Sequence, residues 1–362
     1  MLFFLEAMHK VCAFKNITHA ELIFSAQCCA EDEFWDGTPE TCAFRMKILS
    51  AFYAGVAQAG KISSVSIQNL QNVTPRALKE VDISRVDEPF KRDFKIVMSR
   101  IKQLSLSIAV ESFVDGPAEV VFTDAIHNFL GSELQQYWLG PIAANLEYLK
   151  LYGSKEVYWG FFPVCNLPHF PKIKTLILGG VSFTSERQVQ WILSHASTLQ
   201  ELILDNATIG VAVEIEEFEV DVASRTVLYE RNQPSQWHGY LPVSRHHLLR
   251  PEGWLDATRW HHLFRRFREE LPGLRHFVIN HSHWDDHAFE HADALSTALK
   301  EERYTFFKEF YWKSFSNSES GNVVFREQEE DEKDRLHIER PDCNEEDQQA
   351  LNELLEELKK RT

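Results

Sequence analysis

The chain has 362 residues, a net charge of −16 and a hydrophobic content of 44%, so it can bury a large core beneath an acidic surface. That acidity excludes nucleic acids and anionic membranes as general partners, because both present negative phosphate groups. The apolar runs are also shorter than the ~18 residues that a membrane-spanning helix needs. We therefore expect neither a nucleic-acid partner nor a membrane partner.

The first 60 residues predict two helices and a strand. A helix is expected over 2–11 and a strand over 17–24. Thr38 and Pro39 then resemble a helix start, because a hydroxyl N-cap precedes a proline at the first helical position. After this start, apolar residues recur every four positions, as on a helix that buries one face: Phe44, Ile48, Phe52 and Val56.

One phrase recurs in the middle of the chain and organises the rest. It reads Leu/Ile-x-x-Leu-x-Leu and begins at Leu146, Ile173 and Leu199, at steps of 27 and 26 residues. Leucine-rich repeats have a period of ~20–29 residues, and each unit contains a strand and a helix. Looser versions of the phrase begin at Ile62, Ile101 and Leu274.

The phrase predicts an α/β fold. In each strand the last two apolar residues share one face, and no unit can bury that face alone, so neighbouring units must stack. We expect an irregular leucine-rich-repeat-like solenoid with a parallel sheet on its inner face and helices outside. Helices are predicted from 87, over 118–130, from a capping box at Ser185 and Gln188, and over 258–271 and 286–300. A last strand is predicted over 304–312.

Two segments interrupt or end this rhythm. Residues 210–255 predict an insertion that begins with a hairpin over 211–229. Residues 316–362 carry 15 acidic and 7 basic side chains, a net charge of −8. Within this tail we expect a mobile linker over 316–343 and a helix over 344–361 with a leucine stripe, which either docks or is marginal by itself. The predicted regions are 1–60, a repeat body over 61–312, and 313–362.

The six cysteines show no Cys-x-x-Cys pair or regular framework. Reduced thiols are expected, which suits a cytoplasmic or nuclear protein, and the N-terminus lacks the basic segment of a secretory signal. His9 and Cys12 with Cys28 and Cys29 offer a zinc-like spacing, but ordinary packed cysteines are the favoured interpretation. We predict no cofactor and no metal site.

Two stretches of the repeat body carry a family resemblance. Residues 188–204 read Gln-Val-Gln-Trp-Ile-Leu-Ser-His-Ala-Ser-Thr-Leu-Gln-Glu-Leu-Ile-Leu, and 271–277 read Leu-Pro-Gly-Leu-Arg-His-Phe, with Arg303-Tyr304 further on. With the rest of 260–307, they resemble the leucine-rich-repeat-like C-terminal region of filamentous-fungal F-box proteins. The resemblance covers about 60–312 and rests on loosely spaced apolar positions.

The resemblance implies a function. In that family the repeat region binds substrate proteins, and an N-terminal F-box docks the adaptor of a Skp–cullin ubiquitin ligase. Residues 1–60 depart from the family, because no helix opened by Leu-Pro is evident there. The expectation is therefore a non-enzymatic protein-binding module that recruits substrates for such a ligase. A scaffold with no link to a ligase is the closest alternative.

One histidine cluster suggests a different class of protein. His281, His283 and His287 follow a predicted strand, as in the His-x-His-x-Asp-His motif of metallo-β-lactamase-like hydrolases. Position 286 is Asp where that motif needs His, and no second ligand set follows. An acidic helix start after a strand end is the favoured interpretation. The metal-dependent hydrolase remains an alternative, and no catalytic residue is predicted.

A partner-binding face follows from the strand pattern. The residue between the paired apolar positions points away from the core of each unit, and these residues form the row Ser66, Ser105, Lys150, Ile177, Ile203 and Val278. The row turns apolar at its end, so we expect either the insertion or a partner protein to cover that end. The residues predicted to bind a partner are Lys150, Tyr152, Ile177, Ile203, Asp205 and Val278.

Overall fold

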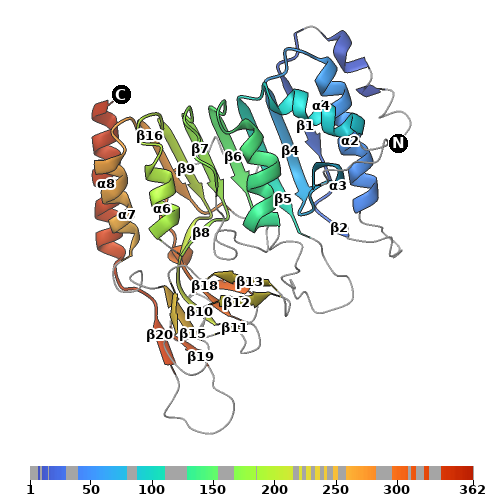
Figure 1. The fold of residues 1–362 in the computed structure, drawn as a ribbon. Coiled ribbons are helices and arrows are strands. Elements are labelled where there is room, and N and C mark those ends of the chain that lie inside the picture. The colour runs from blue at the N-terminus through green and yellow to red at the C-terminus, as the bar shows by residue number, and fades with distance from the viewer. Residues whose placement is uncertain are drawn as a thin grey trace.

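A seven-stranded parallel sheet is the centre of a mixed α/β protein (Figure 1). Its strands are β1 (His19–Ile23), β4 (Ser64–Gln71), β5 (Gln103–Ala109), β6 (Tyr148–Tyr152), β7 (Thr175–Gly179), β9 (Glu201–Asp205) and β16 (His276–Asn280). They lie side by side in chain order, and each neighbouring pair is parallel. Every strand predicted from the recurring phrase is therefore confirmed.

The computed structural model describes most of the chain. The described residues are 7–8, 10–14, 16–29, 40–79, 88–110, 129–153, 167–184, 186–214, 220–221, 226–229, 233–236, 240–242, 248–251, 258–282, 296–308, 311–314, 322–325 and 336–361. Most of the helix predicted over 2–11 lies outside this part of the chain.

The chain enters six of these strands in the same way. The carbonyl of the residue before a strand accepts two hydrogen bonds, from the backbone N–H groups of the residue before the next strand and of that strand's first residue. The Lys102 carbonyl, for example, accepts from Glu147 at 2.8 Å and from Tyr148 at 3.1 Å. The other carbonyls that accept such a pair belong to Thr18, Ser63, Glu147, Lys174 and Gln200.

Three strands share a positive-φ residue at or near their ends. Asn69, Gly180 and Asn206 have φ values of 57°, 64° and 50°, and they are the positive-φ residues of the described chain. Each stands two residues after the last leucine or isoleucine of its phrase. Glycine and asparagine tolerate this left-handed conformation best. Gly180 and Asn206 directly follow β7 and β9, whereas Asn69 lies within β4 at the register shift between Ile67 and Leu70.

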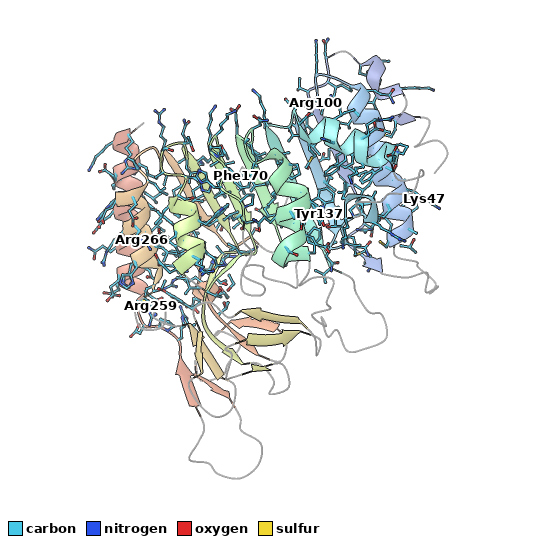
Figure 2. All side chains as sticks on the ribbon, viewed as in Figure 1. Lys47, Arg100, Tyr137, Phe170, Arg259 and Arg266 are labelled. Carbon is cyan, nitrogen blue, oxygen red and sulfur yellow. The ribbon has the colours of Figure 1, made fainter. Side chains whose placement is uncertain are left out.

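The helices that cover the sheet lie on one face of it (Figure 1). The helices of the described chain are η1 (Val11–Ala13), α2 (Cys42–Gln58), α3 (Arg76–Lys79), α4 (Glu88–Met98), a π-helix η2 (Phe129–Leu139), η3 (Gly140–Ile142), α6 (Glu186–Leu193), α7 (Trp260–Glu270), η6 (Glu301–Arg303) and α8 (Asn344–Arg361). Arginines tie successive helices together. Arg100, labelled in Figure 2, donates to the carbonyls of Val56 and Ala59 at the end of α2.

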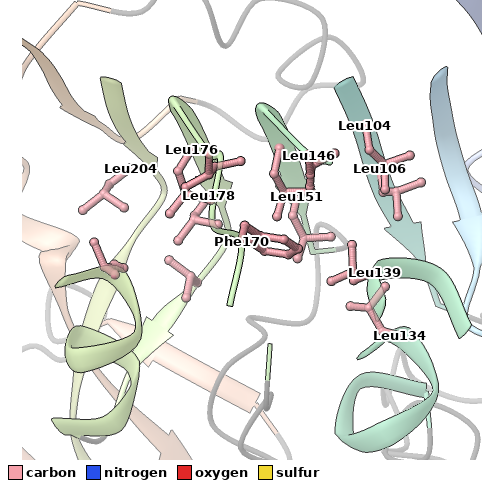
Figure 3. Packing of buried hydrophobic residues seen from close by; sticks show 14 of the residues in the cluster. Leu104, Leu106, Leu134, Leu139, Leu146, Leu151, Phe170, Leu176, Leu178 and Leu204 are labelled. Carbon is pink, nitrogen blue, oxygen red and sulfur yellow. The ribbon is translucent and has the colours of Figure 1, made fainter. Parts of the chain in front are cut away.

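Leucines of neighbouring strands fill the space between the sheet and the helices (Figure 3). Leu176, Leu178, Leu202 and Leu204 are at most 1% exposed, so their predicted burial is confirmed. Phe170 lies between the leucines of β6 and β7, and Leu134 and Leu139 of η2 close the same core. This packing gives the sheet one continuous apolar face.

Two helix predictions differ from the structure. Helix α2 begins at Cys42 rather than at Thr38, and the Thr41 hydroxyl accepts its first cap bond from the Phe44 N–H at 3.2 Å. The reason is that β3 (Glu40–Thr41) pairs with β2 (Cys28–Cys29). The helix predicted over 118–130 lies outside the described residues except for its last two. Helix η2, which begins at Phe129, was not predicted.

A second sheet replaces the predicted end of the repeat body. Its order is β14 (Tyr240–Pro242), β15 (Leu248–Pro251), β10 (Thr208–Glu214), β17 (Tyr304–Lys308) and β18 (Tyr311–Ser314), with β8 (Ser182–Phe183) also paired to β10. The prediction of one strand over 304–312 is wrong, because β17 and β18 form an antiparallel pair in this sheet. Figure 1 shows the sheet beyond the C-terminal ends of the main strands.

The hairpin predicted over 211–229 is correct only in its second part. β11 (Val220–Asp221) and β12 (Thr226–Tyr229) are antiparallel, and β13 (Gln233–Gln236) joins them. The first predicted strand belongs to β10, which pairs in parallel with β17 instead. Residues 296–300 are not helical, because the Ala298 N–H bonds the Ile279 carbonyl along the edge of β16 at 2.8 Å. Residues 283–295 lie outside the described chain.

The tail is more structured than predicted. β19 (Asn322–Phe325) and β20 (Leu336–Glu339) form an antiparallel pair within the expected linker, so that expectation is wrong for these residues. The predicted C-terminal helix is present as α8. It packs on α7, and Ala350, Leu351, Leu354 and Leu358 are buried in the core.

Candidate functional site

The candidate site is the face of the seven-stranded sheet opposite the helix-packed core, which we call the inner face. Ser66 pairs in register with Ser105, which pairs with Lys150. The row continues through Ile177 and Ile203 to Val278. All six predicted row residues therefore stand at one level of the sheet.

The apolar end of this row is buried. Ile177, Ile203 and Val278 form a cluster of their own with Tyr152, separate from the main core, and Tyr148 packs against it. Their exposed fractions are 1%, 1% and 3%, so other atoms of the chain contact them. Lys150 and Asp205 are buried as well. All six residues predicted to bind a partner are thus beneath the surface, and partner binding there stays a prediction.

The insertion residues that could cover this end include Trp237 and Trp254, which lie outside the described residues. The described strands of the insertion belong to the second sheet and to the β11–β13 sheet. That either the insertion or a partner covers the apolar end of the row stays a prediction.

Asp205 is the polar centre of the inner face. Its carboxylate accepts hydrogen bonds from the Tyr152 hydroxyl at 2.9 Å, the Ser282 hydroxyl at 2.6 Å and the Ser282 N–H at 3.0 Å. The Tyr152 ring lies against Gly179, where an added Cβ would come within 2.3 Å of the ring. Three donors satisfy the carboxylate, so Asp205 links β9 to β6, across the intervening β7, and to the residue pair that follows β16.

The residues at the beginning of each strand form an accessible part of the inner face. Two residues before the buried row along each strand, the Nδ1 atom of His19 lies 2.8 Å from the Ser64 hydroxyl oxygen. At the other end of that level, the Nδ1 atom of His276 lies 2.6 Å from Glu201 Oε1. Register pairing joins the two ends through Gln103, Tyr148 and Thr175. All of these residues are at least partly exposed, so a partner can reach them.

Of the histidine cluster, the described chain contains only His281. Its exposed fraction is 5%, and its Nε2 atom has no hydrogen-bond partner. Burial, and then the charges of Lys300 and Arg303, lower the pKa of His281 to about 4. Two cations beside a buried imidazole oppose the binding of a metal ion. His283 and His287 lie outside the described residues.

A buried ionic network, which we did not predict, connects α7 to α8. Asp347 accepts from Arg303 Nε and the Tyr304 hydroxyl, each at 2.9 Å, and from the His261 N–H at 2.9 Å. Burial, and then Asp347, raise the pKa of Tyr304, so its phenol stays neutral and donates. Sequence spacing gave no signal, because His261 and Asp347 stand 86 residues apart.

Comparison with protein-family models, with curated proteins and with solved structures found no match to this chain. Within the described residues, no helix combines the length and the apolar character required to cross a membrane.

Proposed function

We propose that the chain is a non-enzymatic protein-binding module built as an irregular leucine-rich-repeat-like solenoid. The observation that carries this proposal is the repeated backbone geometry of the strand entries. Six successive carbonyls accept the same pair of N–H groups, at 2.8–3.2 Å, across strands whose sequence spacing varies widely. A stack of equivalent units produces this pattern, and such stacks commonly bind partners along their sheet face.

The binding surface in this proposal is the inner face. Its exposed side chains, including Glu21, Gln103 and His276, would contact the partner directly. The predicted residues Lys150, Tyr152, Ile177, Ile203, Asp205 and Val278 would form the rigid layer beneath them. A face that combines polar side chains with a buried apolar layer suits a specific protein partner better than a small substrate.

The specific form of the proposal is substrate recruitment for a Skp–cullin–F-box type ubiquitin ligase in the cytoplasm or nucleus. The resemblance of 60–312 to the fungal family supports it. The test mixes the purified chain with purified Skp-type adaptor, and asks whether the two co-elute. Absence of binding would leave a scaffold without a ligase link, and would refute direct adaptor binding by this chain.

A second experiment tests the binding face. The variant Glu21→Arg with Gln103→Arg changes exposed inner-face residues, while Lys95→Glu with Arg187→Glu changes exposed residues of α4 and α6. Each chain is used to capture partners, which are quantified against the unchanged chain. The inner-face variant should lose its partners, whereas the helix variant should retain them. Equal retention by both folded variants would refute the inner face as the binding surface.

A further inference from the structure

Three metal-ligating side chains meet where α8 packs on α7. They are His261 in the first turn of α7, Cys343 just before α8, and Asp347 in the first turn of α8, and their ligand atoms all lie within 4.8 Å of one another. Within the described chain, this is the one group of three such residues close enough to share an ion. Nitrogen, thiolate sulfur and carboxylate oxygen are the three ligand types that zinc uses in proteins.

We propose that His261, Cys343 and Asp347 bind a Zn²⁺ ion that fastens the C-terminal helix to the repeat body. A four-coordinate site would use His261 Nδ1, Cys343 Sγ and Asp347 Oδ1, with a water as fourth ligand. The His261 side chain is 12% exposed, which gives the water and the ion a route to the site. Cys343 and Asp347 are both buried.

The distances fit a site that closes around an ion with small adjustments. Zinc ligands at about 2.0–2.3 Å from the metal are about 3.3–3.8 Å from one another in a tetrahedron. Here the three ligand atoms lie within 4.8 Å of one another, and His261 Nδ1 lies 2.9 Å from Asp347 Oδ1. The second distance is that of a hydrogen bond, so the ion takes the place of the shared proton and moves the two atoms slightly apart.

The neighbours of Asp347 provide the outer shell that such a site requires. Arg303 Nε and the Tyr304 hydroxyl both donate to Oδ2 at 2.9 Å, while Oδ1 accepts from the His261 backbone N–H at 2.9 Å and faces the His261 ring. Ligating carboxylates are typically held by hydrogen bonds of this kind. A thiolate and a carboxylate together offset the charge of Zn²⁺, and the Arg303 guanidinium beside the same carboxylate leaves the site with one positive charge.

Protons balance in a simple way. Binding replaces the Cys343 thiol proton with the metal, and that proton leaves to solvent. The proton that His261 Nδ1 shares with Asp347 is replaced by one taken up from solvent at Nε2, so a neutral imidazole releases none overall. Each ion bound therefore releases one proton. Since the ligands come from both helices, the ion favours the docked state of α8 over any state in which α8 separates.

The test uses the full chain, stripped with a chelator and titrated with Zn²⁺ and, as a spectroscopic probe, Co²⁺. We expect one ion per chain, one proton released, and cobalt absorption typical of tetrahedral coordination with thiolate. The variants Cys343→Ser and His261→Ala should weaken Zn²⁺ binding at least tenfold. The matched controls Cys42→Ser and His276→Ala should bind like the unchanged chain.

The unchanged chain provides a test that does not depend on how the variants fold. X-ray absorption of its zinc complex should show one sulfur neighbour at about 2.3 Å and the remaining nitrogen or oxygen neighbours at about 2.0–2.2 Å. Failure to bind one Zn²⁺ per chain would overturn the proposal. So would a complex with no sulfur or with several, or binding that Cys343→Ser leaves unchanged.

Discussion

The two ends of the seven-stranded sheet share one face and differ on the other. Toward the helices, β4 and β5 contribute buried residues such as Ile67 and Leu106, just as β7 and β9 contribute Leu178 and Leu204. On the inner face the first end is polar, with Ser66 and Ser105, whereas the last four strands bury an apolar cluster. Packing against the helices requires the first face to be apolar throughout, while the inner face is free to vary along the sheet.

The two edge strands of the sheet also differ in how well other parts of the chain cover them. At the β1 edge, Ile23 is 56% exposed. At the β16 edge, residues 296–300 bond to the strand and α8 packs nearby, fixed by the Asp347 network. The second end is therefore closed by contacts that the first end lacks within the described chain. The comparison predicts where substitutions are most damaging.

The largest effect is expected from breaking the closure at the β16 end. In chelator-treated protein, Asp347→Ala should lower the free energy of unfolding by about 3–5 kcal/mol, because Arg303 stays buried without its counter-charge. Chemical denaturation measures the loss, and amide exchange should show α8 opening first. Glu353→Ala, which removes the exposed ion pair with Arg268, is the matched control and should change little. Equal effects of the two substitutions would contradict the closure.

The shared face is tested by matched substitutions at its two ends. Leu106→Ala and Leu202→Ala should each cost about 2–5 kcal/mol, through lost burial and a cavity, because both side chains are fully buried in the same core. The two losses should be similar. If the stability lost in Leu106→Ala is only a small fraction of that lost in Leu202→Ala, the core is not equally packed along the sheet.

Acid should weaken the second end first. Burial is the main cause that lowers the pKa of both His195 and His281 to about 4, from 6.5 when unfolded. Between pH 4 and pH 6.5 the unfolded chain therefore binds more protons than the folded chain. The stabilisation that comes from these pKa shifts is complete above pH 6.5 and is lost as the pH falls toward 4. Each histidine contributes up to about 3 kcal/mol to this loss.

Melting temperatures at pH 7.5 and pH 5 measure this loss. His281→Gln should reduce the difference between the two pH values, because glutamine does not gain a proton. His276→Gln, at an exposed position, is the control. An unchanged pH dependence in His281→Gln would show that this imidazole is not held neutral by the fold.

The core face was predictable because it repeats. Leucines two residues apart, at steps of 26 and 27 residues, give both the strands and their parallel order, and the same pattern sets the register of the row from Ser66 to Val278. Helix α8 was predictable from its leucine stripe and its terminal charges. Both are local periodic signals.

The closed end was not predictable because its contacts are not periodic. β10 pairs in parallel with β17, although the hairpin expected from the sequence would have paired β10 with its immediate neighbour. Helix η2 contains Gly131 and is wound as a π-helix, so its apolar residues lack the 3.6-residue period. The Asp347 network joins residues more than 40 positions apart, and only folding brings them together.

A smaller effect is expected on the inner face at its closed end. Tyr152→Phe keeps the ring on Gly179 but removes a donor from the buried Asp205 carboxylate. The expected cost is about 1–3 kcal/mol, measured by chemical denaturation. Tyr137→Phe, at a partly buried position on η2, is the control. A cost no greater than that of the control would mean that Ser282 alone satisfies Asp205.

The smallest effect on stability is expected at the open end. Ser105 stands in register with Lys150 and, two strands further, with Ile177, but it is only half-buried. Ser105→Ile places an apolar side chain in the row on the far side of Lys150, and should change the free energy of unfolding by less than about 0.5 kcal/mol, because it disturbs no buried contact. Under the proposed function, the same variant should reduce partner capture, since it replaces a polar contact with an apolar one.

Ile203→Ala, in the same row, should have the opposite effects on stability and on partner capture. Ile203 is 1% exposed, so the substitution should cost about 2–5 kcal/mol by leaving a cavity in the Tyr152 cluster. Where the folded fraction is retained, partner capture per folded molecule should remain near that of the unchanged chain. The polar end would then determine recognition and the apolar end stability. If Ile203→Ala instead abolished capture without loss of stability, Ile203 would itself be a contact residue, and the assignment of the two ends would be reversed.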